Sequence, residues 1–235
     1  MKTLDLCQLL QQHPYPGRGI VLGRSADDQK AVIAYFIMGR SENSRNRIFV
    51  ETEDGIRTQA FDPAKMTDPS LIIYHPVRMV GRGVVVTNGD QTDTIRDYLL
   101  EGRTFAEALR TRCFEPDPPN YTPRISGLLS PDGSFKLSIL KSADGNPDCN
   151  LRHFYEYDAP LAGEGRFIHT YQENADPLPS FEGEPRRVSI TAPSAQTLAN
   201  ELWASLNEDN KVSLYVCYRD LASGEMDTVI VNKHQ

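Results

Sequence analysis

The feature that most constrains this fold is a series of short strand patterns grouped in blocks, without regular alternation with helices. Residues 19–38 predict a hairpin, because a polar turn at 25–29 joins two apolar runs. Residues 47–61 predict a second hairpin around a turn at 53–55. Further strands are predicted at 71–74, 83–87, 125–129, 134–141, 151–157, 165–172, 187–191, 211–219 and 228–232.

Only a few segments have helical periodicity. Residues 93–101 place apolar side chains on one helical face and stop at Gly102. A second helix follows, because Thr104 and Glu107 form a capping-box pattern ahead of the apolar face of Phe105, Ala108 and Leu109. A third helix is predicted at 194–206, and residues 6–10 resemble a short amphipathic helix.

This order of elements predicts an α+β protein in which antiparallel sheets are stacked under helices. The proline-rich segment 114–120 is too short and too stiff to be a domain linker, so we expect a fixed loop and a single domain over residues 1–235. The acidic segment 173–185 is expected to be an exposed loop.

Charge and cysteine usage exclude several classes of protein. A formal net charge of −7 argues against non-specific binding to nucleic acid. No run of 18 apolar residues predicts a membrane span, and the N-terminus lacks the apolar core of a secretory signal, so we expect a cytoplasmic protein. The four cysteines are scattered without CxxC spacing, so a metal site is not expected.

The segment 39–47, GRSENSRNR, follows the apolar run AVIAYFIM and concentrates positive charge in an acidic chain. Arginine has a planar, permanently charged fork that matches phosphate oxygens, and serine and asparagine add neutral donors. The same composition is also typical of a solvated surface loop. The residues that could contact an anion here are Arg40, Ser41, Asn43, Arg45, Asn46 and Arg47.

Three other segments carry polar groups at predicted strand ends. Residues 87–94, TNGDQTDT, lead from a strand into a helix, where backbone amides can face an anion or simply form a turn and an N-cap. Tyr74 ends a strand, where its phenol is either a packed core group or a proton donor and acceptor. Arg124 precedes a strand, a position where arginine is more often a surface residue.

Taken together, GRSENSRNR, the strand with Tyr74, VVTNGDQTDT and TPRI resemble the archaeal-type IMP cyclohydrolase family. The resemblance extends from about Gly17 to the strand after Arg124. It implies a four-layer αββα sandwich of two antiparallel sheets, called Ntn-hydrolase-like. It also implies ring closure of 5-formamidoimidazole-4-carboxamide ribonucleotide to IMP with loss of water, the last step of purine synthesis, without a cofactor.

The partner implied by the resemblance is a purine nucleoside monophosphate. Tyr74 would then move a proton near the formyl oxygen, and an arginine would stabilise the oxyanion. Glu115, or Asp90 and Asp93, would accept from the carboxamide or the ribose hydroxyls. We expect the guanidinium groups of residues 40, 45, 47 and 124 to share one cavity. The implied catalytic residues are Tyr74, Arg40, Arg47 and Glu115, and the implied substrate contacts are Ser41, Asn43, Arg45, Asn46, Thr87, Asn88, Gly89, Asp90, Asp93 and Arg124.

Two alternatives stay open from the sequence. One is a nucleotide-binding module without catalysis, in which Tyr74 is merely packed. The other is an amide hydrolase on the same scaffold, which would need an N-terminal nucleophile that Met1 and Lys2 do not provide. The sequence does not identify which arginine binds the phosphate, and it leaves a homo-oligomer open.

Overall fold

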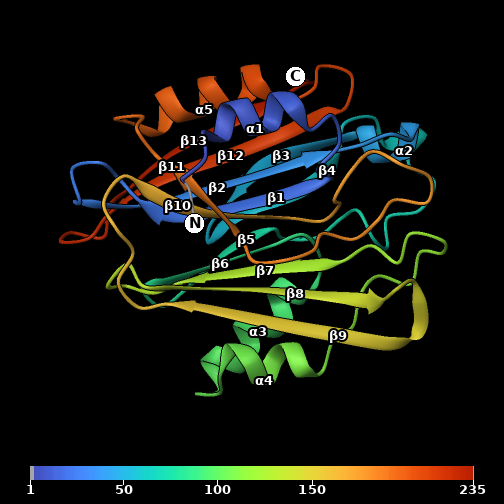
Figure 1. The fold of residues 1–235 in the computed structure, drawn as a ribbon, viewed down its shortest axis with the longest axis horizontal. Coiled ribbons are helices and arrows are strands. Elements are labelled where there is room, and N and C mark those ends of the chain that lie inside the picture. Colours follow the sequence, from blue (N-terminus) through green and yellow to red (C-terminus); the bar gives the residue numbers. More distant parts are fainter. Residues whose placement is uncertain (1–2, 235) are drawn as a thin grey trace.

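The computed structural model describes residues 3–234, which form two antiparallel sheets (Figure 1). The expectation that Met1 and Lys2 provide no N-terminal nucleophile therefore lies outside the described residues. The six strands of the first sheet are, in spatial order, β11 (Arg186–Ser189), β10 (Glu164–His169), β1 (Arg18–Arg24), β2 (Lys30–Met38), β12 (Lys211–Asp220) and β13 (Met226–Asn232). The seven strands of the second are β3 (Arg47–Thr52), β4 (Gly55–Ala60), β5 (Val77–Val80), β6 (Gly83–Thr87), β7 (Arg124–Leu129), β8 (Phe135–Ala143) and β9 (Asn146–Tyr157).

Helices cover the outer faces of the two sheets. In Figure 1, α1 (Leu6–Gln12) and α5 (Ala195–Ser205) lie above the first sheet, whereas α3 (Gln91–Leu100) and α4 (Phe105–Arg110) lie below the second. A one-turn helix, α2 (Glu42–Arg45), and a 3₁₀ turn, η1 (Pro63–Lys65), follow β2 and β4. The expected α+β class with antiparallel sheets and few helices is confirmed.

The apolar run of β2 is continuous because this strand is buried on both faces. Ile33, Tyr35 and Ile37 pack between the two sheets. Ala34 and Phe36, pointing the other way, pack under α1 and α5. A third, smaller cluster joins α3 and α4 to the second sheet.

Two local predictions near the site are wrong. Residues 71–74 form no strand, and β5 lies instead at Val77–Val80. The backbone of this segment is held by a side chain and not by a strand ladder. The Thr58 hydroxyl accepts from the amide of Tyr74 at 2.8 Å and donates to the Ile72 carbonyl at 2.8 Å. The segment 39–47 is also not wholly a loop, since Ser41 caps α2.

Other predictions hold with shifted bounds. The capping box of Thr104 and Glu107 is present, and Ser194 caps α5. Helix α3 begins at Gln91, two residues earlier than expected. The segment 173–185 is only partly exposed, because Leu178 and Phe181 are buried, and Phe181 contributes to the core between the sheets. Among residues 3–234, no helix combines the length and apolarity needed to cross a membrane.

Candidate active site

One end of the two sheets collects the residues of interest. In the first sheet, Arg18 pairs with Ile37, so the start of β1 lies beside the end of β2. In the second sheet, Thr87 pairs with Ser126, so the end of β6 lies beside the start of β7. Arg47 opens β3 directly after α2. Antiparallel pairing therefore brings segments from distant parts of the sequence to the same end.

Arg47 is the most deeply buried charge at this end, with 0% of its surface exposed. It lies two residues before Phe49, which packs between the sheets, so its side chain has the same inward direction. Its Nε donates to the Ser44 carbonyl at 2.8 Å, but Nη1 and Nη2 have no partner among the described residues. Burial lowers the pKa of Arg47, and the nearby Arg18 cation lowers it further. An unpaired buried guanidinium is a candidate site for an anion.

Tyr74 is bound through its hydroxyl to Tyr35, with 2.8 Å between the two oxygens. Tyr35 belongs to the first sheet and Tyr74 to the segment before β5, so this bond joins the two halves of the sandwich. Burial raises the pKa of Tyr35 well above its ordinary value, and Tyr74 adds to the rise, so Tyr35 keeps its proton. Either hydroxyl can be the donor of this bond. When Tyr35 donates, the Tyr74 proton is free for another acceptor.

Arg18 belongs to this group, although the sequence analysis did not select it. It is buried, and it precedes Ile20 and Leu22 on the inward face of β1. Burial lowers its pKa, but the oxygens of Tyr171 and Tyr15 and the carboxylate of Glu115 outweigh this effect, so the net direction is upward. A charged residue in phase with the inward-facing Ile20 and Leu22 is the sequence signal that could have identified it. We call Arg18, Tyr35, Arg47 and Tyr74 the inner group.

Glu115 lies next to the inner group on the proline-rich loop. Its side chain is almost completely buried, with 3% of the residue exposed, and its amide donates to the Thr122 carbonyl at 2.9 Å. Burial raises the pKa of Glu115 to about 7, against the opposing effects of Arg18, Arg124 and Arg47. A carboxyl group with this pKa can both accept and return a proton near neutral pH.

Arg124 lies on the outer face of the second sheet, because it pairs with Leu140, which packs towards α3 and α4. Its Nη1 donates to Asp90 and to Gln91, both at 2.7 Å, while its Nε is buried without a partner among the described residues. Gly89 permits this approach, since a Cβ there would lie 2.5 Å from Nη1 of Arg124.

Hydrogen bonds and ion pairs within the chain hold the rest of the turn at 87–90. The Thr87 hydroxyl donates to the Gly89 carbonyl at 2.8 Å. The Asn88 side chain donates to the Pro123 carbonyl and accepts from the Ile125 amide, both at 2.8 Å. Burial raises the pKa of Asp90, but Arg124 and Arg112 lower it by more, so the net direction is downward. These contacts fix the start of α3 and the start of β7 to one another.

Several residues expected at the site make structural contacts outside the inner group. Arg45 donates to the Gly39 carbonyl at 2.9 Å and to Asn210 at 3.1 Å. Arg40 lies at the edge, with its guanidinium 5.2 Å from the ring centre of Tyr15. The four guanidinium groups at positions 40, 45, 47 and 124 therefore do not converge as a set. Ser41 caps α2, Asn43 contacts the Asp68 carbonyl, Asn46 binds the backbone of Asp62, and Asp93 pairs with Arg78.

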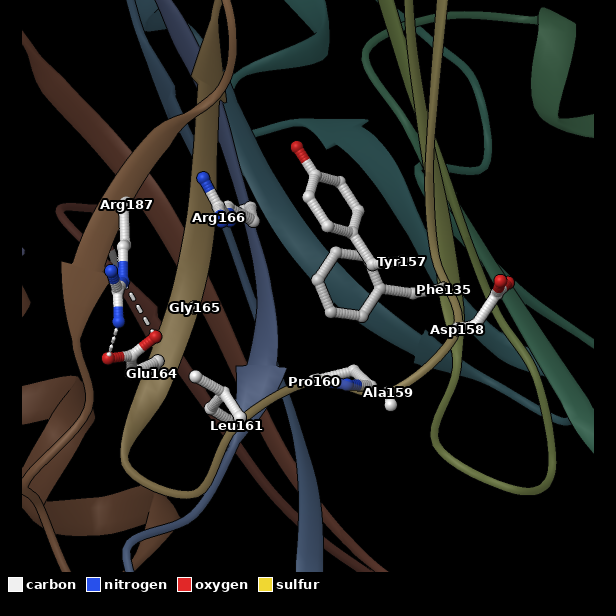
Figure 2. A pocket seen from close by; sticks show the side chains of 10 residues that line it. All are labelled: Phe135, Tyr157, Asp158, Ala159, Pro160, Leu161, Glu164, Gly165, Arg166 and Arg187. Carbon is white, nitrogen blue, oxygen red and sulfur yellow. Dashed lines mark hydrogen bonds and ion pairs between the residues drawn. The ribbon is translucent and has the colours of Figure 1, made fainter. Parts of the chain in front are cut away.

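A separate cavity of about 210 Å³ lies at the opposite end of the sandwich (Figure 2). Tyr157 and Phe135 face Arg166 across it, and Arg187 is paired with Glu164 at its margin. Neither the inner group nor any residue expected at the site lines this cavity. Among the described residues, no group of three His, Cys, Asp or Glu side chains is arranged to hold a metal ion.

The raised pKa of Glu115 predicts a pH-dependent stability. Between its ordinary value of 4.5 and about 7, the folded chain keeps a proton that the unfolded chain has lost. The stabilisation from burying neutral Glu115 is thus complete below pH 4.5 and is lost as the pH rises through 7. Relative to Glu115→Gln, the wild type should lose about 3 kcal/mol of unfolding free energy over this range.

Urea unfolding of both proteins between pH 4.5 and 8 measures this difference. The exposed Glu53→Gln exchange, on the β3–β4 turn, is the matched control for removal of one carboxylate. If the Glu115→Gln and wild-type curves ran parallel across the range, Glu115 would be ionised in the folded chain at all of these pH values, contrary to our expectation.

Comparison with known proteins identifies the family of the whole chain. A family model described as "IMP cyclohydrolase-like protein" matches residues 15–224, which include all four members of the inner group and Glu115. A Halobacterium salinarum protein named IMP cyclohydrolase is 28% identical over 222 residues, covering 93% of this chain and 98% of the relative.

Two further archaeal proteins with the same name give similar matches. The Methanopyrus kandleri protein is 30% identical over 193 residues, covering 72% of this chain and 89% of the relative. The Haloarcula marismortui protein is 29% identical over 227 residues, covering 93% and 98%. The similarity therefore reaches well past Arg124, into the last third of the chain. The chain belongs to the IMP cyclohydrolase-like protein family.

Proposed function

We propose that this protein is an IMP cyclohydrolase, which closes 5-formamidoimidazole-4-carboxamide ribonucleotide to IMP with loss of water. The proposal is carried by one observation in the inner group. The buried Nη1 and Nη2 atoms of Arg47 have no partner among the described residues, and the phenol of Tyr74 lies near them. The names of the archaeal relatives support the same reaction.

The reaction is intramolecular, so the first task of the protein is orientation. The carboxamide nitrogen must be held against the formyl carbon, and such positioning can supply several kcal/mol of the barrier. We propose that the two substituents lie beside the inner group, where the surrounding sheets would restrict their rotation. We assign Arg47 to the formyl oxygen, where its free Nη1 and Nη2 atoms would stabilise the negative charge that develops as the nitrogen attacks.

Proton transfer completes the reaction. Formation of the C–N bond removes one proton from the carboxamide nitrogen, and formation of the C=N bond removes one from the formamido nitrogen. Both protons end on the former formyl oxygen, which leaves as water. Glu115 is suited to accept a proton from nitrogen because its pKa lies near 7. We propose that Tyr35 donates to the Tyr74 oxygen, which leaves the Tyr74 proton to be delivered to the formyl oxygen.

The remaining expected residues would act outside the reacting atoms. We propose that Arg40 and Arg124 flank the bound nucleotide and contact its polar groups. The contacts of Arg45, Asn46 and Asn88 hold the segments that carry the inner group. The two helix-covered sheets support assignment of the four-layer αββα, Ntn-hydrolase-like sandwich, and we place the enzyme in the cytoplasm.

The direct test is to incubate the purified full chain with the formamido ribonucleotide and to follow IMP formation by absorbance. Catalysed formation of IMP, at a rate proportional to protein concentration, is expected. Tight binding of IMP without turnover would contradict the proposal and would favour the non-catalytic nucleotide-binding module.

A further inference from the structure

A second arginine group lies at the end of the sandwich opposite the inner group. Arg24 and Arg219 both pair with Ala31 of β2, from its two sides. Since Ala31 packs between the sheets, both arginines have the inward direction of the first sheet. Two strand spacings separate them by about 10 Å. Arg82 comes from the second sheet, in the turn between β5 and β6.

Arg219 is almost wholly buried, with 2% of its surface exposed, yet its Nε and Nη1 have no partner among the described residues. The Oδ1 atom of the adjacent Asp220 is directed to its own turn, where it accepts from the amides of Ala222 and Ser223 at 3.0 and 2.7 Å. Burial lowers the pKa of Arg219, and Arg82 lowers it further. A cation in this position is costly unless a counter-charge reaches it.

Arg82 meets Arg219 over the turn that joins β12 and β13. A Cβ at Gly224 would lie 3.5 Å from Nη2 of Arg219 and 3.9 Å from Nη2 of Arg82. Within residues 3–234, no carboxylate lies in ion-pair contact with either guanidinium. The two positive groups are thus brought together without a negative partner from this chain.

Arg24 flanks the pair. Its guanidinium packs on the β7–β8 turn, where a Cβ at Gly133 would lie 2.8 Å from its Nη2. Its Nη1 is 3.4 Å from the exposed carboxylate of Asp28, and its Nε is buried without a partner among the described residues. Glycines therefore leave room for guanidinium groups at two turns of this end, Gly133 for Arg24 and Gly224 for Arg219 and Arg82.

We propose that Arg219 and Arg82, flanked by Arg24, form a second oxyanion site, which takes a phosphate group at the end of the sandwich opposite the Arg47 site. Guanidinium forks match phosphate oxygens, and a phosphate would supply the counter-charge that the chain itself does not provide. This site uses none of the residues assigned to catalysis, so it goes beyond the proposed function.

Thermal unfolding of the full chain in inorganic phosphate, compared with chloride at equal ionic strength, tests the site. Arg47→Met serves as the background, because it removes the unpaired guanidinium nitrogens of the inner group, which are the other candidate anion site. In this background we expect phosphate to raise Tm by about 3 °C at tenfold excess over Kd. The rise should disappear when Arg219→Met is added and should be reduced by the exposed Arg82→Gln. Arg57→Met, an exposed arginine exchange on β4, should leave it unchanged.

The behaviour in chloride alone separates a ligand site from a structural role. An unpaired buried cation destabilises the free chain, so Arg219→Met should equal or exceed its parent in Tm. A phosphate-induced rise that is unchanged in both Arg219→Met and Arg82→Gln would overturn the proposal. The proposal would also be overturned if Arg219→Met had a lower Tm than its parent in chloride while phosphate still raised the Tm of Arg82→Gln by the full amount. None of these readouts depends on turnover, so they are independent of the test of the proposed function.

Discussion

Replacing Arg47 with methionine is expected to lower kcat/KM for IMP formation by about 10³-fold, because the free guanidinium nitrogens would no longer stabilise the charge on the formyl oxygen. The same exchange removes a buried, unpaired cation and keeps most of the side-chain volume. The free energy of unfolding of the ligand-free protein should therefore stay equal or rise by ~1–2 kcal/mol. Steady-state kinetics and urea unfolding of the same preparation measure both effects.

The combination of lost activity and retained stability is the informative result. Arg57→Met, an exchange on the exposed side of β4, controls for the loss of one positive charge and should change neither quantity much. If Arg47→Met unfolded more easily and retained its activity, Arg47 would be a structural residue bound to Ser44, and the assignment to the formyl oxygen would be wrong.

Tyr74→Phe is expected to lower kcat by 10²–10³-fold with little change in KM, since the phenol would deliver a proton only as water leaves. Tyr35→Phe should lower kcat by about tenfold, because it removes only the bond that directs the Tyr74 hydroxyl. The double variant should be no slower than Tyr74→Phe alone. This lack of additivity would indicate that the two hydroxyls act as one unit.

Tyr218→Phe is the matched control for the loss of a buried tyrosine hydrogen bond in the same sheet. Its hydroxyl donates to the Ala192 carbonyl at 2.8 Å, on the face covered by α5 and away from the inner group. This variant should lose stability with little change in kcat. Wild-type turnover in Tyr35→Phe, or fully additive losses in the double variant, would contradict the coupling.

The site was only partly predictable because sequence spacing does not determine the direction of a side chain. Arg45 and Arg47 are two residues apart, yet one is bound to Gly39 and Asn210 and the other is enclosed between the sheets. Arg18 lies about thirty positions from Arg47 along the chain and was not selected, although the fold brings its charge close enough to lower the pKa of Arg47. Residues 71–74 looked like a strand, but the hydroxyl of Thr58 holds that backbone instead.

The sequence by itself determined the fold class, most strands and the starts of α4 and α5. These features depend on local apolar patterns and capping, as in the apolar run of β2 and the capping box of Thr104 and Glu107. Only the tertiary structure decided which charges meet. Strand register and the stacking of two sheets bring Arg18, Arg47 and Tyr74 together, and they leave Arg219 facing Arg82 at the other end. Contacts between strands remote in sequence leave no local pattern, so their chemistry appears only when the chain is folded.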